Sequence, residues 1–147
     1  GSALYKAGTV HPHVPEMERN LAGAGASVPV GFAPQLAPMA RGILLTATVP
    51  LSEAVAPEAV HALYTARYDG EPFVRVLDAG TWPETRAVRG SNRCDLAATT
   101  LHDGRTLFVT AAIDNLVKGA AGQALQNLNL MLGWPEAWAL PVHGTPW

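Results

Sequence analysis

The longest regular pattern of apolar and polar positions lies at residues 112–133, AIDNLVKGAAGQALQNLNLMLG. At 100° per residue an apolar stripe falls on one side, as is typical of a helix that faces a core; it comprises Val117, Ala120, Ala121, Ala124, Leu128 and Met131. The opposite side carries amides, glycines and one lysine, namely Asn115, Lys118, Gly119, Gly122, Gln126 and Asn129. Since glycine weakens a helix by about 1 kcal/mol relative to alanine, this amide side predicts a close, hydrogen-bonding neighbour. The pattern alone favours a plain helix–helix contact there.

The rest of the chain shows shorter helical and β patterns. Helices are predicted at 14–24, where Pro15 fits the first turn, and at 58–68. Apolar or alternating runs predict strands at 27–32, 42–49, 73–77 and 84–89. A hairpin is predicted to join 94–101 to 106–111, because the intervening Asp103-Gly104 favours a tight turn with positive φ.

This order of elements predicts an α+β fold. The sheet, formed from residues 27–111, is expected to be mixed and mostly antiparallel with helices on one face. The long C-terminal helix follows the sheet, and a tail rich in tryptophan and proline, residues 133–147, is expected to pack on the surface.

Composition and charge narrow the possible functions. Only 15% of the 147 residues are charged, 48% are hydrophobic and the net charge is −2, so neither a nucleic-acid surface nor a disordered chain is predicted. No apolar run could span a membrane and no secretory signal is visible. A single cysteine fits a reducing cytoplasm. So few charges predict that a partner covers part of the surface.

Candidate chemistry is sparse. His11 and His13 flank Pro12 and could serve as a general base or ligate a metal, but the other histidines form no ligand spacing, so no metal site is expected. Cys94 opens an alternating strand and lacks the helix N-terminus that activates a thiol, which predicts a structural role. Gly119 and Gly122 lie inside a helix, so no phosphate loop is predicted. Arg41 and Lys118 are the cations best placed to hold a phosphate or carboxylate.

Four segments stand out in sequence order: HPHVPEM (11–17), FAPQLAPMARGIL (32–44), GSNRC (90–94) and the helical pattern at 112–133. Together they resemble the C-terminal part of the N-acetyl-gamma-glutamyl-phosphate reductase family, within the semialdehyde dehydrogenase superfamily. The resemblance covers about residues 5–133, and the last segment is the most specific.

The resemblance implies a domain plan and an activity. Such enzymes join an N-terminal Rossmann domain, which holds NADP and a catalytic cysteine, to a dimerisation domain resembling the C-terminal domain of glyceraldehyde-3-phosphate dehydrogenase. They reduce an acyl phosphate to an aldehyde through a thioester, here N-acetyl-glutamyl phosphate to its semialdehyde in arginine biosynthesis. Residues 3–111 would be the catalytic and dimerisation domain, and 112–147 a helix and tail that pack on the absent Rossmann domain. Residues 1–2, Gly-Ser, are interpreted from their own sequence as a cloning scar.

The resemblance also implies site residues. HPH matches the family's His-Arg-His, which makes His11 and His13 the acid/base candidates, with His13 preferred; Pro12 replaces the family's arginine. Arg41 would hold the anionic substrate. Asn115 and Lys118 would begin the helix facing the nicotinamide, so the amide side would meet the Rossmann domain and cofactor. Cys94 matches the family's SNxC position and not the nucleophile.

A chain without nucleophile and dinucleotide fold is predicted to be inactive alone. The expected partners are a small acyl-phosphate substrate, its own Rossmann domain and a second copy bound through the sheet, in the cytoplasm, with no nucleic acid or membrane. Three alternatives remain. The paralogous reductase that acts on a carrier-bound aminoadipyl phosphate is disfavoured by only 10 Lys and Arg against 12 Asp and Glu. A non-enzymatic dimerisation or binding module is the second, and a hydrolase built on Cys94 is the least favoured.

Overall fold

Two units make up the chain, Gly1–Ala40 and Arg41–Trp147, in the computed structural model, which describes residues 1–8 and 10–144. The end of the predicted tail, residues 145–147, lies outside the described part.

The first unit contains one helix and a small ladder. Helix α1 spans His13–Gly23, which confirms the helix predicted there, and strands β1 (Ala3–Leu4) and β2 (Gln35–Leu36) pair antiparallel. The strand predicted at 27–32 is wrong: within it, only Phe32 forms a bridge, to Gly8. The backbone N–H of Val30 instead donates to the Glu18 carboxylate on α1 at 2.9 Å, so this segment runs along the helix.

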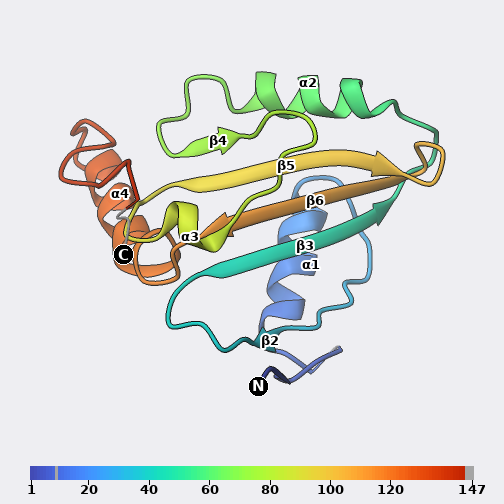
Figure 1. Ribbon diagram of the computed structural model, residues 1–147, viewed down its shortest axis with the longest axis horizontal. Helices are drawn as coiled ribbons and strands as arrows, with labels where there is room; N and C mark the ends of the chain where they lie inside the picture. The colour runs from blue at the N-terminus through green and yellow to red at the C-terminus, as the bar shows by residue number, and fades with distance from the viewer. Residues whose placement is uncertain (9, 145–147) are drawn as a thin grey trace. The chain divides into compact units, whose positions relative to one another are not determined.

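The second unit is built on a four-stranded sheet in the order β3-β6-β5-β4 (Figure 1). Its strands are β3 (Ile43–Pro50), β4 (Val74–Val76), β5 (Cys94–Leu101) and β6 (Thr106–Ile113). β6 pairs antiparallel with both β3 and β5, whereas β4 pairs parallel with β5. The predicted mixed, mostly antiparallel sheet is therefore confirmed. The hairpin is confirmed as well, with φ of +57° at Asp103 and +81° at Gly104 in its turn.

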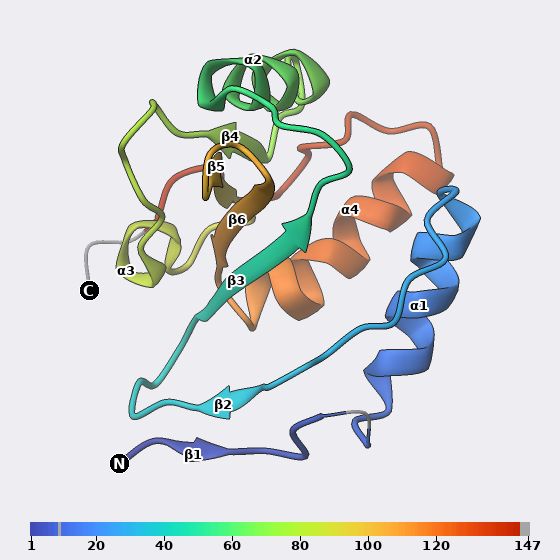
Figure 2. The same ribbon diagram turned by 90° about the vertical axis from the view of Figure 1, so that its right-hand side faces the viewer.

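Helix α2 (Pro57–Arg67) covers one face of the sheet over β5 (Figure 2). Val60 packs there against Leu96 and Ala98, with Tyr64 and Tyr68 around them. The outer strand β3 is not covered by α2 in this way: Ile43, Leu45 and Val49 share the α2 side, because they pair in register with Ile113, Ala111 and Leu107 of β6. Each of the three remains 43–47% exposed within the chain.

The strand predicted at 84–89 is wrong. Residues Thr85–Val88 form the short helix α3. Its turn is closed by the Ala87 N–H, which donates to the Glu84 carbonyl oxygen at 3.1 Å. Val88 is fully buried. Alternating apolar and polar residues suggested a strand here. The segment instead forms a single helical turn that buries one apolar side chain.

The long helix predicted at 112–133 begins later than its pattern suggests. Ala112 and Ile113 complete strand β6, where Ala112 is fully buried. A π-helical turn η1 (Val117–Ala121) then leads into α4 (Gly122–Met131). Figure 1 shows α4 beyond the end of the sheet at which β6 finishes.

The assignment of the two sides of this helix is also wrong. The amide side is the buried one: Gln126 is 8% exposed and Asn129 1%. The apolar stripe faces outward, with Leu128 at 42% and Met131 at 82% exposure. The helix turns its polar side inward because the chain supplies hydrogen-bond partners there for both polar atoms of the Gln126 side chain and for Nδ2 of Asn129. Oδ1 of Asn129 is buried without a partner among the described residues.

Candidate functional site

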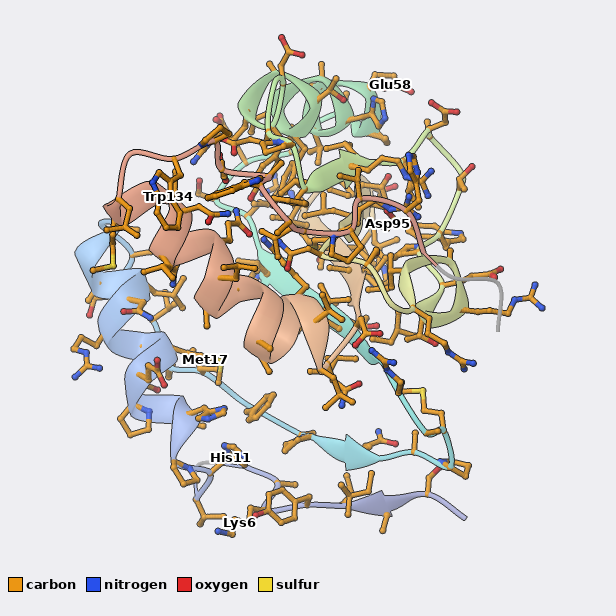
Figure 3. The ribbon with its side chains drawn as sticks, turned by 90° about the vertical axis from the view of Figure 1, so that its left-hand side faces the viewer. Lys6, His11, Met17, Glu58, Asp95 and Trp134 are labelled. Carbon is orange, nitrogen blue, oxygen red and sulfur yellow. The ribbon has the colours of Figure 1, made fainter. Side chains whose placement is uncertain are left out.

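The two candidate histidines lie together in the first unit, where His11 precedes α1 and His13 is its first residue. The backbone N–H of His13 points to Nδ1 of His11 at 3.2 Å, and the two ring centroids are 4.7 Å apart. Phe32 packs edge-on against the His11 ring at 5.0 Å. Figure 3 shows His11 and Lys6 on neighbouring stretches of this unit. The structure therefore gives the pair unequal surroundings.

The surroundings of His11 favour its neutral form. Burial lowers its pKa, and the nearby charges of His13 and Lys6 lower it further. Because Nδ1 accepts the His13 N–H, the proton of the neutral ring sits on Nε2. His13 is exposed, so its ring is open to solvent.

Arg41 lies in the second unit, at the start of β3, and is paired with a buried carboxylate. Its Nη2 lies 2.7 Å from Oδ2 of Asp114, whose side chain is fully buried while that of Arg41 is 34% exposed. Oδ2 also accepts the Gly90 N–H at 2.6 Å. Oδ1 accepts the N–H groups of Leu116 at 2.8 Å and Val117 at 3.1 Å. Asp114 thus joins the start of β3, the loop before β5 and the start of η1.

These contacts decide the ionisation of Asp114. Burial alone would raise the pKa of this carboxyl group, but hydrogen bonds from Gly90, Arg41, Leu116 and Val117 outweigh it and hold the pKa below its ordinary value. The group is therefore a carboxylate at neutral pH, and its bond to Arg41 is charge-assisted.

Asn115 contacts the backbone of Gly42, the residue that follows Arg41. Its Oδ1 accepts the N–H of Gly42 at 2.7 Å. Gly42 has φ +114°, and a Cβ there would lie 2.7 Å from Cβ of Thr85, so glycine is required at this close approach. Asp114 and Asn115 therefore fix two consecutive residues at the start of β3.

Lys118 is turned into the buried network of the amide side. Its Nζ donates to Oε1 of Gln126 at 2.7 Å and lies 5.4 Å from the centroid of the Phe73 ring. Burial lowers the pKa of this ammonium group. The same Oε1 also accepts a hydrogen bond from Nδ2 of Asn92 at 2.9 Å. Lys118 and the loop before β5 therefore donate to one and the same amide oxygen.

Asn129 joins α4 to the tail. Its Nδ2 donates to the carbonyl oxygens of Glu136 and Trp138, both at 3.0 Å. Nε2 of Gln126 donates to the Glu136 carboxylate at 2.6 Å. The close neighbours expected on the amide side are therefore the chain's own tail and the loop before β5. The tail packs on the unit, as expected, since the Pro141 carbonyl oxygen accepts the Asn92 N–H at 2.7 Å.

Comparison with known proteins identifies the family to which the chain belongs. The model of the semialdehyde dehydrogenase dimerisation domain matches residues 1–115 of the chain. The chain belongs to this family.

Within residues 1–8 and 10–144, no helix is both long and apolar enough to cross a membrane, and no group of three or more His, Cys, Asp or Glu side chains lies together as a metal site would require.

Curated relatives of this dimerisation domain share about half of its residues. It is 51% identical to the N-acetyl-gamma-glutamyl-phosphate reductase of Thermus thermophilus over 95% of the chain but 44% of that protein. The reductases of Desulforamulus reducens and Saccharopolyspora erythraea are 52% and 48% identical, over 91% and 98% of the chain and 39% and 43% of their own lengths. The chain thus spans about two fifths of the relatives it matches.

Asp114 is the residue of this dimerisation domain that sequence reasoning missed. The pattern placed it inside a long helix, where a carboxylate has no special role. An available signal was its position just before a helical run, because aspartate commonly accepts the first free N–H groups of a helix. That is the contact which Oδ1 makes to Leu116 and Val117.

The thiol of Cys94 is expected to react slowly, and this expectation does not depend on any catalytic role. Burial raises the pKa of its thiol, and the nearby Asp95 charge adds to this against the opposing charge of Lys118. We expect iodoacetamide at pH 7.5 to alkylate Cys94 at least several-fold more slowly than free cysteine, because the thiolate is the reacting form. Mass spectrometry of timed samples measures the rate, with urea-unfolded chain as the control. Equal rates in both states would contradict a structural thiol.

Proposed function

We propose that this chain is the dimerisation-domain half of an NADP-dependent reductase that converts N-acetyl-glutamyl phosphate to N-acetyl-glutamate semialdehyde in the cytoplasm. The observation that carries the proposal is about 50% identity, over nearly the whole chain, to relatives named for that reductase. No matched relative reported above is named for the aminoadipyl paralogue. The arginine-pathway substrate is therefore favoured over the carrier-bound one.

In this proposal His13 is the acid/base group and His11 supports it. An aldehyde-forming reductase must move a proton to or from the substrate oxygen near neutral pH, for which histidine is suited. The His13 ring is exposed, whereas Nδ1 of His11 accepts the His13 N–H. Since His11 also has a lowered pKa, it suits a neutral hydrogen-bond donor through Nε2.

Arg41 is proposed to hold the anionic substrate. Asp114 takes one nitrogen of its guanidinium, while the side chain stays 34% exposed, so further N–H donors remain for a phosphate or carboxylate. An ordinary ion pair on the surface is disfavoured as the explanation of this contact, because the partner carboxylate is fully buried.

The cofactor side of the proposal needs a second domain. NADPH would supply a hydride to an acyl thioester formed on that domain's cysteine. Asn115 and Lys118 begin the segment proposed to face the nicotinamide, but Oδ1 of Asn115 is bound to Gly42 and the Lys118 ammonium group to Gln126. These two side chains do not by themselves form a nucleotide site. We therefore propose that a Rossmann domain like that of the longer relatives holds NADP.

The outward stripe of α4 is the proposed contact for that domain. Leu128 and Met131 continue into Leu130 and Leu132, which are 55% and 52% exposed. Several exposed apolar side chains gathered on one side of a helix support an interaction site there. The sequence alone suggested that the amide side meets the Rossmann domain, but that side is bonded to the chain's own tail and to the loop before β5. The apolar side is therefore proposed as the contact instead.

A second copy of the chain is proposed to bind through the sheet at β3. The change Leu45→Asp places a charge among the exposed side chains of Ile43 and Val49 and is expected to convert a dimer to a monomer in light scattering after size exclusion. Met131→Asp, which also adds a charge at an exposed apolar position but outside the sheet, is the matched control and should remain dimeric. A dimeric Leu45→Asp variant would rule out this surface.

The function is tested in a chimaera that carries this chain in place of the matching segment of the Thermus thermophilus reductase. We expect the chimaera to oxidise NADPH with N-acetyl-glutamyl phosphate, and the chain alone not to do so. Activity only with a carrier-bound aminoadipyl phosphate would favour the lysine-pathway paralogue. A folded, dimeric chimaera inactive with both substrates would favour a non-enzymatic dimerisation module.

A further inference from the structure

The buried carboxylate of Asp114 brings together three parts of the second unit that are far apart in the sequence. One oxygen binds Gly90 and Arg41, and the other binds the N–H groups of Leu116, just before η1, and of Val117, its first residue. All four contacts lie between 2.6 and 3.1 Å. Because every lone-pair direction of the carboxylate is engaged, Asp114 has no acceptor capacity left for a substrate.

Among the described residues, the ion pair with Asp114 holds the Arg41 guanidinium at one nitrogen. A guanidinium has five N–H donors, and the ion pair with Asp114 uses Nη2. Its Nε is buried without a hydrogen-bond partner among the residues the structure describes. The ion pair with Asp114 fixes the direction of the planar group, and the donors that remain besides the buried Nε are left to bind an anion.

The backbone beneath Arg41 is fixed as well. The Gly42 N–H donates to Asn115, the residue that follows Asp114, so the side chain and the adjoining peptide are held by two neighbouring residues. A side chain held at both places loses little rotational freedom when an anion binds.

We propose that Asp114 is the positioning residue that orients the Arg41 guanidinium toward the anionic group of the substrate. The proposal rests on the substrate-binding role given above to Arg41. It assigns to Asp114 no contact with the reacting atoms. A purely structural alternative exists, since Asp114 also joins Gly90 to the start of η1, and the two roles predict different kinetics.

The test uses the chimaera and a matched pair of variants. Asp114→Asn keeps the size of the side chain but removes its charge. It is expected to raise KM for the acyl phosphate about tenfold or more, since hydrogen bonds between charged groups are the strong ones, with a smaller effect on kcat and none on KM for NADPH. Asp95→Asn is the control, because Asp95 is 1% exposed and pairs with Arg75 and Arg93 instead. It should lower stability and leave both KM values unchanged.

A double-variant cycle separates the outcomes. Arg41→Gln should raise the same KM, and adding Asp114→Asn to it should raise KM no further. If Asp114→Asn leaves this KM unchanged while Arg41→Gln raises it, Asp114 is structural and the proposal is overturned while the proposed function stands. If Arg41→Gln has no effect in an active chimaera, both the role of Arg41 and that of Asp114 are overturned.

A binding experiment on the chain alone decides the matter if the chimaera is inactive. Inorganic phosphate is expected to shift the Nε–H resonance of Arg41 in nitrogen–proton correlation spectra. Asp95→Asn should keep this response and Asp114→Asn should lose it. The same phosphate response in the Asp114→Asn variant would overturn the positioning role independently of any activity.

Discussion

In the chimaeric reductase, His13→Asn is expected to lower kcat by a factor of about 10²–10⁴, the usual contribution of a positioned acid/base group. Asparagine keeps a polar side chain of similar reach but cannot exchange a proton near neutral pH. The effect should fall on kcat and not on KM for NADPH. Steady-state rates of NADPH oxidation at saturating substrate measure it.

The paired variant His11→Asn should lower kcat less. Its Nδ1 already accepts the His13 N–H, and the pKa of His11 is lowered by burial and by the charges of His13 and Lys6. His102→Asn is the matched control: His102 is exposed in the hairpin turn with φ +51°, a conformation that asparagine adopts readily. A larger loss in His11→Asn than in His13→Asn would reverse the two roles.

The second large effect is on stability. Gly122→Ala is expected to lower the free energy of unfolding by about 1–3 kcal/mol, as overpacking of a tight interior does. A Cβ at this position would run into Oδ1 of Asn92 and would lie 2.7 Å from both Cγ1 and the carbonyl oxygen of Val117. The π-helical turn is the reason for this crowding, because it directs the Val117 carbonyl to the Gly122 N–H. Urea unfolding followed by circular dichroism measures the change.

Gly119→Ala is the matched control, three residues earlier. A Cβ there would meet Cδ1 of Ile113 at 3.4 Å and the Asp114 carbonyl at 3.5 Å, which are ordinary contacts. Since alanine favours helical backbone over glycine by up to about 1 kcal/mol, this variant should be neutral or more stable. Equal destabilisation by both alanines would show that the crowding at Gly122 is relieved at low cost.

These two glycines illustrate how far the sequence could predict the helix. Its pattern correctly indicated that something approaches the amide side and hydrogen-bonds to it. It reversed the two sides because the rule that apolar stripes face the core takes no account of polar partners that lie elsewhere in the chain. Here Gln126 and Asn129 find partners in the loop before β5 and in the tail, while Met131 faces outward.

Strong local signals were the reliable ones elsewhere. The apolar β-branched run of β3 and the Asp103-Gly104 turn each carry their structure in a few adjacent residues, and both were predicted correctly. The segments 27–32 and 84–89 were predicted wrongly, because their hydrogen bonds depend on Glu18 and on a single turn closed by Ala87. Alternation of apolar and polar residues over six positions does not contain that information.

The sequence predicted only part of the candidate site, because some of its contacts join residues that lie far apart in the chain. His11, His13 and Arg41 could be proposed as site residues from residue type and segment resemblance, and these roles stay predictions. Asp114 gains its importance from Gly90 and Arg41, which lie 24 and 73 residues earlier in the chain. No local pattern reports such a contact.

That long separation has a consequence for folding. The Gly42–Asn115 bond spans 73 residues, and it lies at the end of a ladder in which β3 must find β6 across most of the second unit. Contacts of such high sequence separation carry a large loop-closure cost and form slowly. We therefore expect Arg41 to acquire its orientation only after β3 has joined the sheet. A partly folded chain that already holds the β5–β6 hairpin would still lack the oriented arginine that is proposed above to hold the anion.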